Sequence, residues 1–180
     1  IGLSGSEEVY WATFNNKCCG GIEVTASHNP INFNGLKLVG PTSRPLNQET
    51  EVDSIKDLVI KNNFLKNSKS LGNLINYSKE AKADYISKLW SFLDVKKDFS
   101  IKILTNAGNG VAGPILDFLE EKIKVSGFNI NFIKIFNTPD SSFPNGIPNP
   151  LLPENQSITG EKVIACEADL GIAFDGDFDR

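Results

Sequence analysis

Apolar residues return every three or four positions in residues 7–16 and again in residues 49–61. This spacing gathers the apolar side chains on one face and is typical of amphipathic helices. Ser6 precedes the first of these segments and is expected to be its N-cap. Between the two segments, residues 21–26 and 36–39 form short apolar runs bounded by turn-forming residues, which indicates strands. We therefore expect a helix, two strands joined by a loop, and a second helix.

The rest of the chain alternates short apolar runs with longer amphipathic segments. This alternation is typical of a mostly parallel α/β sheet. A polar, Lys/Asn-rich connector over residues 62–78, with a short strand expected near 71–75, separates it from the first half, so we expect two domains, 1–77 and 78–180. The elements expected in the second domain are a helix over 80–93, a strand over 101–105, a glycine-rich turn over 106–113, a helix over 114–125, a strand over 130–136, a loop over 137–155, a weakly helical segment over 156–166 and a strand over 170–174.

Composition narrows the classes of function. The net charge of −4 gives no basic footprint for nucleic acid and no polybasic patch for a membrane surface. No apolar run approaches the roughly 20 residues of a membrane span, and the opening segment lacks the basic and apolar regions of a secretory signal. Three cysteines (Cys18, Cys19 and Cys166) and a single histidine favour reduced thiols in a cytoplasmic protein over a disulfide framework or a zinc site.

Three aspartates alternate in the segment DGDFDR that follows the last expected strand. In a tight loop Asp175, Asp177 and Asp179 would converge, and three close carboxylates repel one another unless a cation binds them. Ligand sets made only of oxygen select a hard ion such as Mg²⁺, Mn²⁺ or Ca²⁺. In open α/β sheets, ligands bind outside the carboxyl ends of the strands, where this loop lies. Gly176 is expected to permit a sharp turn at φ values that other residues avoid.

The acidic segment has two other interpretations. An EF-hand calcium loop needs Gly at its sixth position and a closing Glu, but Arg180 occupies that position and a strand precedes the loop. A solvated acidic turn without an ion is the second interpretation. The position after a buried strand favours a metal site over that turn.

A second conspicuous segment, TASHNP, contains Ser27 next to His28. A hydrolase triad is disfavoured, because adjacent side chains on an extended loop point apart and the loop lacks G-x-S-x-G. Two interpretations stay open from the residues alone: a serine that carries a phosphate, and a turn whose polar side chains bond their own backbone. Lys37, on the return strand, is either a group that steers phosphate or exchanges a proton, or a surface lysine.

Taken together, the two loops resemble the α-D-phosphohexomutase superfamily. TASHNP followed by NGLK, and later GIAFDGDFDR, carry the resemblance, and NAGNGVAGP and NTPDSSFPNGIPNPLLPEN extend it over nearly the whole chain. Within the superfamily these segments are most similar to the bacterial phosphomannomutases of nucleotide-sugar and surface-polysaccharide synthesis. Phe178, where many relatives have Gly, favours that subgroup.

The resemblance implies roles for individual residues. Ser27 matches the phosphoserine that donates and recovers the phosphoryl group, and its oxygen would complete an Mg²⁺ site. Lys37 matches the proposed proton-transfer lysine. The other implied residues are the Mg²⁺ ligands Asp175, Asp177 and Asp179, and the active-site residues His28, Asn29 and Arg180.

The resemblance also implies a reaction and a fold. Transfer of phosphate to a hexose phosphate gives a bisphosphorylated sugar, which returns its other phosphate, so that mannose 1-phosphate and mannose 6-phosphate interconvert. We expect an α/β fold of two three-layer domains with mixed, largely parallel sheets, meeting at a cleft between Ser27 and the aspartates. Family members have four domains, so the chain would be the end of domain 1 and most of domain 2, without domains 3 and 4. Alone it would have no turnover and weakened metal binding.

Two alternatives to a phosphomannomutase remain. The first is a phosphoglucomutase, a dual-specificity mutase or a phosphoglucosamine mutase. The second is a non-catalytic module that binds phosphate or metal on the same scaffold. The presence of Ser27, Lys37 and all three aspartates argues against the second alternative.

Overall fold

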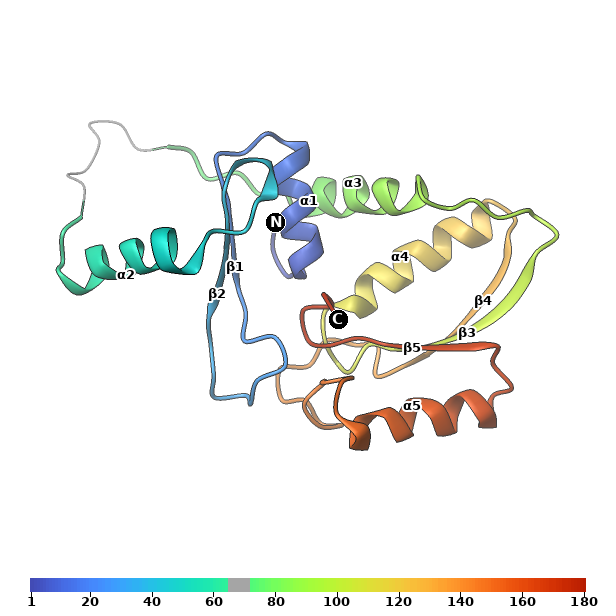
Figure 1. The fold of residues 1–180 in the computed structure, drawn as a ribbon. Coiled ribbons are helices and arrows are strands. Elements are labelled where there is room, and N and C mark those ends of the chain that lie inside the picture. The colour runs from blue at the N-terminus through green and yellow to red at the C-terminus, as the bar shows by residue number, and fades with distance from the viewer. Residues whose placement is uncertain (65–71) are drawn as a thin grey trace.

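A computed structural model describes residues 1–64 and 72–180 and has an α/β fold with two separate sheets (Figure 1). The strand expected near residues 71–75 is not observed over 72–75, and Leu71 lies outside the described residues. No helix in the described ranges combines the length and the apolar character needed to cross a membrane.

A parallel three-stranded sheet organises the second half of the chain. Its order is β4-β3-β5, and both strand pairs are parallel. Figure 1 shows α4 on one face of this sheet and α5 on the other, so the predicted alternation does produce three layers. In chain order the elements are α3 (Ser78–Trp90), β3 (Ser100–Asn106), α4 (Ala112–Val125), β4 (Asn129–Ile135), α5 (Pro153–Ala165) and β5 (Leu170–Ala173).

Local sequence explains how these layers close. Leu104 and Thr105, near the end of the central strand β3, have no exposed surface. Gly171 lets α5 pack closely on β5, since a Cβ there would lie 2.5 Å from the Val163 side chain. Gly127, with φ at +73°, follows the C-cap of α4 and ends that helix as predicted. These contacts fix the carboxyl end of β5, from which the acidic loop extends.

The first half of the chain contains a two-stranded antiparallel sheet. The strands β1 and β2 pair in a register that places Glu23 opposite Lys37. The expected continuous helix over 49–61 is a π-helical turn, η2 (Gln48–Val52), followed by α2. Figure 1 shows α2 projecting away from the other helices. The remaining elements are α1 (Ser6–Asn15), β1 (Gly21–Val24), β2 (Leu36–Val39), the short 3₁₀ turn η1 (Pro41–Ser43) and α2 (Asp53–Ile60).

The N-cap of α1 differs from the sequence-based prediction. Gly5 is the N-cap, and its backbone N–H donates a 3.0 Å hydrogen bond to the Glu8 carboxylate, as in a capping box. Ser6 is instead the first helical residue and is fully buried. Its hydroxyl is therefore not used to cap the helix, and it lies close to the acidic loop.

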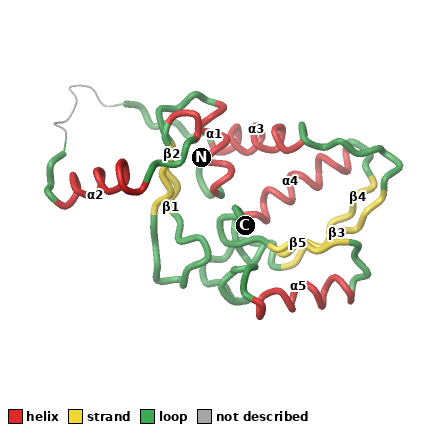
Figure 2. The backbone as a smooth tube through the Cα atoms, in the orientation of Figure 1, coloured by secondary structure: helices red, strands yellow, loops and turns green. Residues whose placement is uncertain are grey.

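Contacts between the two halves bring the two conspicuous loops together. The carboxylate of Glu8 in α1 is 3.0 Å from Lys82 Nζ in α3. Phe178, from the acidic loop, lies against the start of α1, because a Cβ at Gly5 would be only 2.2 Å from its ring. Figure 2 shows that loops, rather than helices or strands, form the region where the two halves meet below α1.

Candidate functional site

The serine loop and the acidic loop are joined by direct hydrogen bonds. Ser27 Oγ donates to Asp175 Oδ2 at 2.8 Å, and the Asp175 side chain is fully buried. Thr25 links the same two loops, because its hydroxyl accepts from the Ser27 backbone N–H at 2.9 Å and donates to Asp177 Oδ2 at 2.8 Å. Ser27 itself has φ at +53°, in the left-handed region that is uncommon for residues other than glycine.

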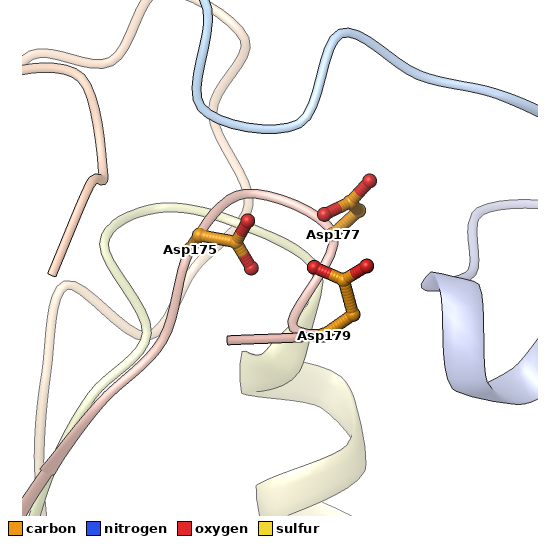
Figure 3. Close-up of side chains that lie close together, drawn as sticks. All are labelled: Asp175, Asp177 and Asp179. Atoms are coloured by element: carbon orange, nitrogen blue, oxygen red, sulfur yellow. The ribbon is translucent and has the colours of Figure 1, made fainter. Parts of the chain in front are cut away.

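The three aspartates form one cluster. Their carboxylate oxygens lie within 4.8 Å of one another, with Asp175 and Asp177 buried and Asp179 exposed. Figure 3 shows the three carboxylates facing a common space at the end of the loop. The three aspartates that alternate in DGDFDR therefore do converge in space, as predicted, in the loop that follows β5.

Gly176 is needed for a reason other than the one predicted. Its φ is not positive; Phe178, with φ at +49°, occupies the left-handed position of this loop. A Cβ at Gly176 would lie 2.6 Å from the Ser27 backbone oxygen, well inside van der Waals contact. Glycine therefore provides room for the serine loop, and the buried ring of Phe178 anchors the turn.

The electrostatics of the cluster fit a divalent cation. Burial raises the pKa of Asp175, with the Ser27 hydrogen bond opposing it and the neighbouring carboxylates adding to it. Burial by itself would also raise the pKa of Asp177. Hydrogen bonds from Lys37 and Thr25 outweigh burial, so the pKa of that carboxyl is lowered. Asp177 Oδ1 is buried and has no hydrogen-bond partner among the described residues. A set of oxygen ligands with one unused buried oxygen suits Mg²⁺ or another hard ion.

Lys37 reaches the cluster from β2. Its Nζ lies 2.6 Å from Asp179 Oδ2, 2.8 Å from Asp177 Oδ2 and 2.7 Å from Ser6 Oγ. Burial acts to lower the pKa of Lys37, but the hydrogen bonds to the two aspartates outweigh it and raise that pKa well above its usual value. Lys37 is therefore an ammonium group held within the site, and the alternative of a free surface lysine does not hold.

His28 contacts Ser27 although the two residues are adjacent, contrary to the expectation that their side chains point apart. His28 Nδ1 lies 3.0 Å from Ser27 Oγ, and Nε2 lies 3.2 Å from Arg180 Nη1. Because a guanidinium only donates, Nε2 accepts and Nδ1 carries the proton in the neutral ring. Ser27 Oγ then accepts from His28 while it donates to Asp175, so the histidine does not act as a base toward the serine as in a hydrolase triad.

Arg180 and Asn29 are placed differently from each other. Arg180 Nε lies 3.9 Å from carboxylate oxygens of Asp175 and Asp179, so its charge faces the cluster. The Asn29 amide instead donates to the Ala26 carbonyl at 2.9 Å, within its own loop. Asn29 also lines a cavity of about 380 Å³ beside Ser27.

Three residues of the site were not identified from the sequence: Thr25, Ser6 and Glu23. Glu23 is buried on β1, and burial raises the pKa of its carboxyl to about 7, with a hydrogen bond from Ser6 opposing the shift. The alternation of side chains in β1 could have indicated Glu23, because it is an acid on the same face as Lys37. Thr25 and Ser6 act through long-range contacts, for which no local pattern exists.

The glycine-rich turn over residues 106–113 contacts the backbone of the acidic loop at Gly176. The Val111 backbone N–H donates to the Gly176 carbonyl at 3.0 Å, and a Cβ at Gly110 would lie 2.6 Å from the same oxygen. The side-chain amide of Asn109 bonds Thr138 and Asn145. These contacts agree with a structural role for this turn.

Comparison with known proteins assigns the chain to a family. The family models described as phosphoglucomutase/phosphomannomutase, alpha/beta/alpha domain I and domain II match residues 1–66 and 83–180. Phosphomannomutases of Salmonella typhimurium strain LT2 and Escherichia coli strain K12 are 48% and 46% identical over 181 and 180 residues, and each match covers 100% of this chain and 39% of the relative.

Solved structures agree in fold. A Thermus thermophilus protein described as a candidate phosphomannomutase matches with a TM-score of 0.77 and 26% identity, over 99% of this chain and 39% of that one. A phosphoglucomutase/phosphomannomutase family protein of Burkholderia thailandensis matches with a TM-score of 0.68 and 29% identity, over 89% and 32%. Because the domain II model alone matches more than half of the residues, the chain belongs to the phosphoglucomutase/phosphomannomutase family.

Proposed function

We propose that this chain is part of a phosphomannomutase in which Ser27 carries the phosphoryl group. The observation that carries the proposal is the 2.8 Å contact between Ser27 Oγ and Asp175 Oδ2. A phosphoryl group on Ser27 would bring nearly two negative charges to a cluster of three carboxylates, and a bound divalent cation would offset this repulsion together with Lys37 and Arg180.

The cation in this proposal is Mg²⁺, held by Asp175, Asp177, Asp179 and an oxygen of the phosphorylated Ser27. The convergence of three carboxylates and the unused oxygen of Asp177 support this ligand set. When bound, a divalent ion neutralises charge on the phosphoryl group during transfer.

The transfer is balanced in atoms and protons. The bond between Ser27 Oγ and phosphorus breaks as a sugar hydroxyl oxygen bonds to phosphorus, so the hydroxyl loses a proton and Ser27 Oγ gains one. Lys37, whose ammonium group lies beside the acids, is assigned to this proton exchange: it would give the proton that Ser27 Oγ gains, and the amine so formed would take the proton that the sugar hydroxyl loses. His28 orients the serine oxygen through Nδ1. Arg180 and Asn29 are assigned to binding of the substrate phosphate. The cationic side chain of Arg180 and the position of Asn29 beside the cavity support this assignment.

Mannose phosphates are the proposed substrates, because relatives that are 44–48% identical over the whole chain bear the name phosphomannomutase. Glucose or glucosamine phosphates are the alternative.

The proposal also includes a boundary near Tyr77 between two units, 1–77 and 78–180. It further includes a cytoplasmic location, which the three free thiols support. Since the chain spans 39% of the length of these relatives, further domains of a longer polypeptide would complete the sugar site.

The test is performed on the full-length protein. Purified protein is expected to carry phosphate on Ser27 by mass spectrometry and to convert mannose 1-phosphate faster than glucose or glucosamine phosphates. Ser27→Ala should lower turnover at least about a thousandfold, as expected for loss of a covalent nucleophile. Ser54→Ala, at an exposed position of α2, serves as the matched control.

Two results would contradict the proposal. An unphosphorylated Ser27 together with no turnover of any hexose phosphate would favour a non-catalytic module. Turnover that survives in Ser27→Ala would move the phosphoryl carrier elsewhere. Residues 1–180 alone are expected to show no turnover, and measurable conversion of mannose 1-phosphate by that chain would contradict this part.

A further inference from the structure

The buried hydroxyl of Ser6 contacts the site but has no role in the proposed reaction. Ser6 is the first residue of α1 and has no exposed surface. Because Gly5 rather than Ser6 is the N-cap, this hydroxyl does not serve the end of the helix. Its Oγ instead accepts a 2.7 Å hydrogen bond from Lys37 Nζ on β2. A buried hydroxyl costs free energy unless it is hydrogen-bonded, so the contact with Lys37 helps to account for a serine at this position.

The start of α1 is fixed against the acidic loop by backbone contacts. The Ser6 backbone N–H donates to the Asp177 carbonyl at 3.1 Å. The approach is close, because a Cβ added at Gly5 would lie 2.6 Å from the same carbonyl oxygen. The position of the Ser6 hydroxyl relative to the acidic cluster is therefore set by the backbone and not by a flexible side chain.

Lys37 reaches the same point through a long side chain. Holding such a side chain in one conformation costs conformational entropy, so it needs several contacts. An ammonium group has three donors, and those of Lys37 are directed at Ser6 Oγ and at carboxylate oxygens of Asp177 and Asp179. The orientation of the ammonium group therefore depends on these three acceptors.

The three acceptors of Lys37 are not equivalent in the proposed reaction. Asp177 and Asp179 are proposed cation ligands, so a bound cation competes with Lys37 for their oxygens. Ser6 is the acceptor of Lys37 that lies outside the acidic triad. The contact with the Ser6 hydroxyl is therefore the one that a cation on the carboxylates does not weaken by competition.

We propose that Ser6 is a positioning residue for Lys37, whose ammonium group its hydroxyl keeps beside the acidic cluster during phosphoryl transfer. The inference rests on the proposed phosphomutase function, because that function assigns Lys37 to the proton exchange. Proton exchange needs Lys37 Nζ within hydrogen-bond reach of the oxygens that gain and lose the proton, so displacement of this atom lowers the rate. Ser6 itself touches neither substrate nor cation in this scheme.

The test is a kinetic double-mutant cycle in the full-length protein with saturating Mg²⁺. Ser6→Ala is expected to lower kcat by about 10- to 100-fold and to change KM less than about threefold, since a hydrogen bond to a charged group used in the transition state is lost. In a Lys37→Met background the same substitution should lower the residual kcat by less than about twofold, because a residue that acts through another is not additive with it. Ser6→Thr keeps the hydroxyl and should retain kcat within about threefold.

Thr13→Val is the matched control for Ser6→Ala. Thr13 is also buried on α1, but its hydroxyl donates to the Val9 carbonyl within the helix rather than to a residue of the site. This variant removes a buried hydroxyl from the same helix and should leave kcat within about twofold of the unmodified protein. Thermal unfolding of every variant detects loss of folding. If the additional methyl group of Ser6→Thr prevents folding, the Ser6→Ala cycle and the position of Lys37 decide the matter.

The position of Lys37 gives a second measurement that does not depend on turnover. In a crystal structure of the Mg²⁺-loaded full-length protein, Lys37 Nζ should lie within hydrogen-bond distance of Ser6 Oγ. In the same crystals of Ser6→Ala, Lys37 Nζ should be displaced from the acidic cluster.

The outcomes distinguish this inference from the proposed function. If the unmodified full-length protein turns over no hexose phosphate, the proposed function and this inference both fail. If it is active, this inference alone fails when the loss in Ser6→Ala is fully additive with that in Lys37→Met, appears in KM rather than kcat, or is matched by Thr13→Val. A folded Ser6→Thr without turnover, or an unmoved Lys37 in the Ser6→Ala crystals, would overturn it as well.

Discussion

The Ser27 hydroxyl donates a 2.8 Å hydrogen bond to the Asp175 carboxylate across a sequence separation of 148 residues. This contact depends on the close approach of two backbones, since a Cβ added at Gly176 would lie only 2.6 Å from the Ser27 carbonyl oxygen. The glycine-rich turn holds Gly176 from the opposite side. If a larger side chain replaced Gly176, the acidic loop would have no space to shift into, so the serine loop would have to move instead.

Replacing Gly176 with Ala should separate the two loops. The added methyl group clashes with the Ser27 carbonyl, and relief of such overpacking costs about 1–3 kcal/mol of stability. The Ser27–Asp175 hydrogen bond should lengthen or break. Urea unfolding monitored by tryptophan fluorescence measures the stability, and phosphate on Ser27 in the full-length protein measures the effect on the site.

Gly160→Ala is the matched control for this substitution. Gly160 lies in α5 with nothing within 4 Å of an added Cβ, so alanine there should stabilise the helix by about 0.5–1 kcal/mol. If Gly176→Ala were as harmless as Gly160→Ala, the close approach of the two loops would not exist in solution.

The acidic cluster should bind a hard divalent cation through all three carboxylates. Asp177→Asn removes one charge and replaces a carboxylate oxygen by an amide, so affinity for Mg²⁺ or Mn²⁺ should fall at least about tenfold. Calorimetric titration with each ion on the full-length protein measures this. Asp98→Asn changes an exposed aspartate of a distant loop and should leave the affinity unaltered. Equal affinities in the two variants would refute the site.

The elements of the fold were largely predictable because they follow local periodicity. The strand expected over residues 36–39 is β2 with the same bounds, and the alternation in the second half produced the observed parallel sheet. The helix expected from Pro114 begins two residues earlier, at Ala112, and the one expected from Gln156 begins at Pro153. Local patterns do not fix such ends, because backbone groups at helix termini find partners elsewhere.

Some residues of the site were also visible in local sequence patterns, whereas others are brought there by long-range contacts. The alternation of Asp175 and Asp177 was visible locally, but the contact of Thr25 with Asp177 joins residues 152 apart and has no local pattern. The reason for Gly176 was misjudged because sequence shows that a residue is small without showing what approaches it. Glu23 was overlooked because a single acid in a short strand is ordinarily exposed. Its burial follows from the packing of α1 on the hairpin.

The ion pair between Glu8 and Lys82 should contribute strongly to the packing of α1 on α3. Glu8 is 1% exposed in its side chain, so Lys82→Met would leave a buried carboxylate without its counter-charge, at a cost of about 3–5 kcal/mol. Lys61→Met breaks an exposed pair with Asp57 one helical turn away and should cost less than about 0.5 kcal/mol. Urea unfolding of both variants makes the comparison, and equal costs would contradict the burial of Glu8.

Glu23 should make the stability of the protein fall as the pH rises in the absence of metal. Burial raises the pKa of its carboxyl from 4.5 to about 7. Below pH 4.5 the group is protonated in both the folded and the unfolded chain and has no net effect. Between pH 4.5 and 7 only the unfolded chain releases the proton, so the unfolded state gains stability, and above pH 7 the full cost of an ionised buried carboxylate remains.

Glu23→Gln removes this titration without changing the shape of the side chain. The free energy of unfolding in EDTA, measured by urea titration, should match that of the unmodified protein near pH 4.5 and exceed it by roughly 1–3 kcal/mol at pH 8. Comparing the two proteins at each pH cancels the titration of every other group. Glu49→Gln, at an exposed position, should give a difference that does not vary with pH. A flat difference for Glu23→Gln would mean that the Glu23 carboxylate is hydrated in solution rather than buried.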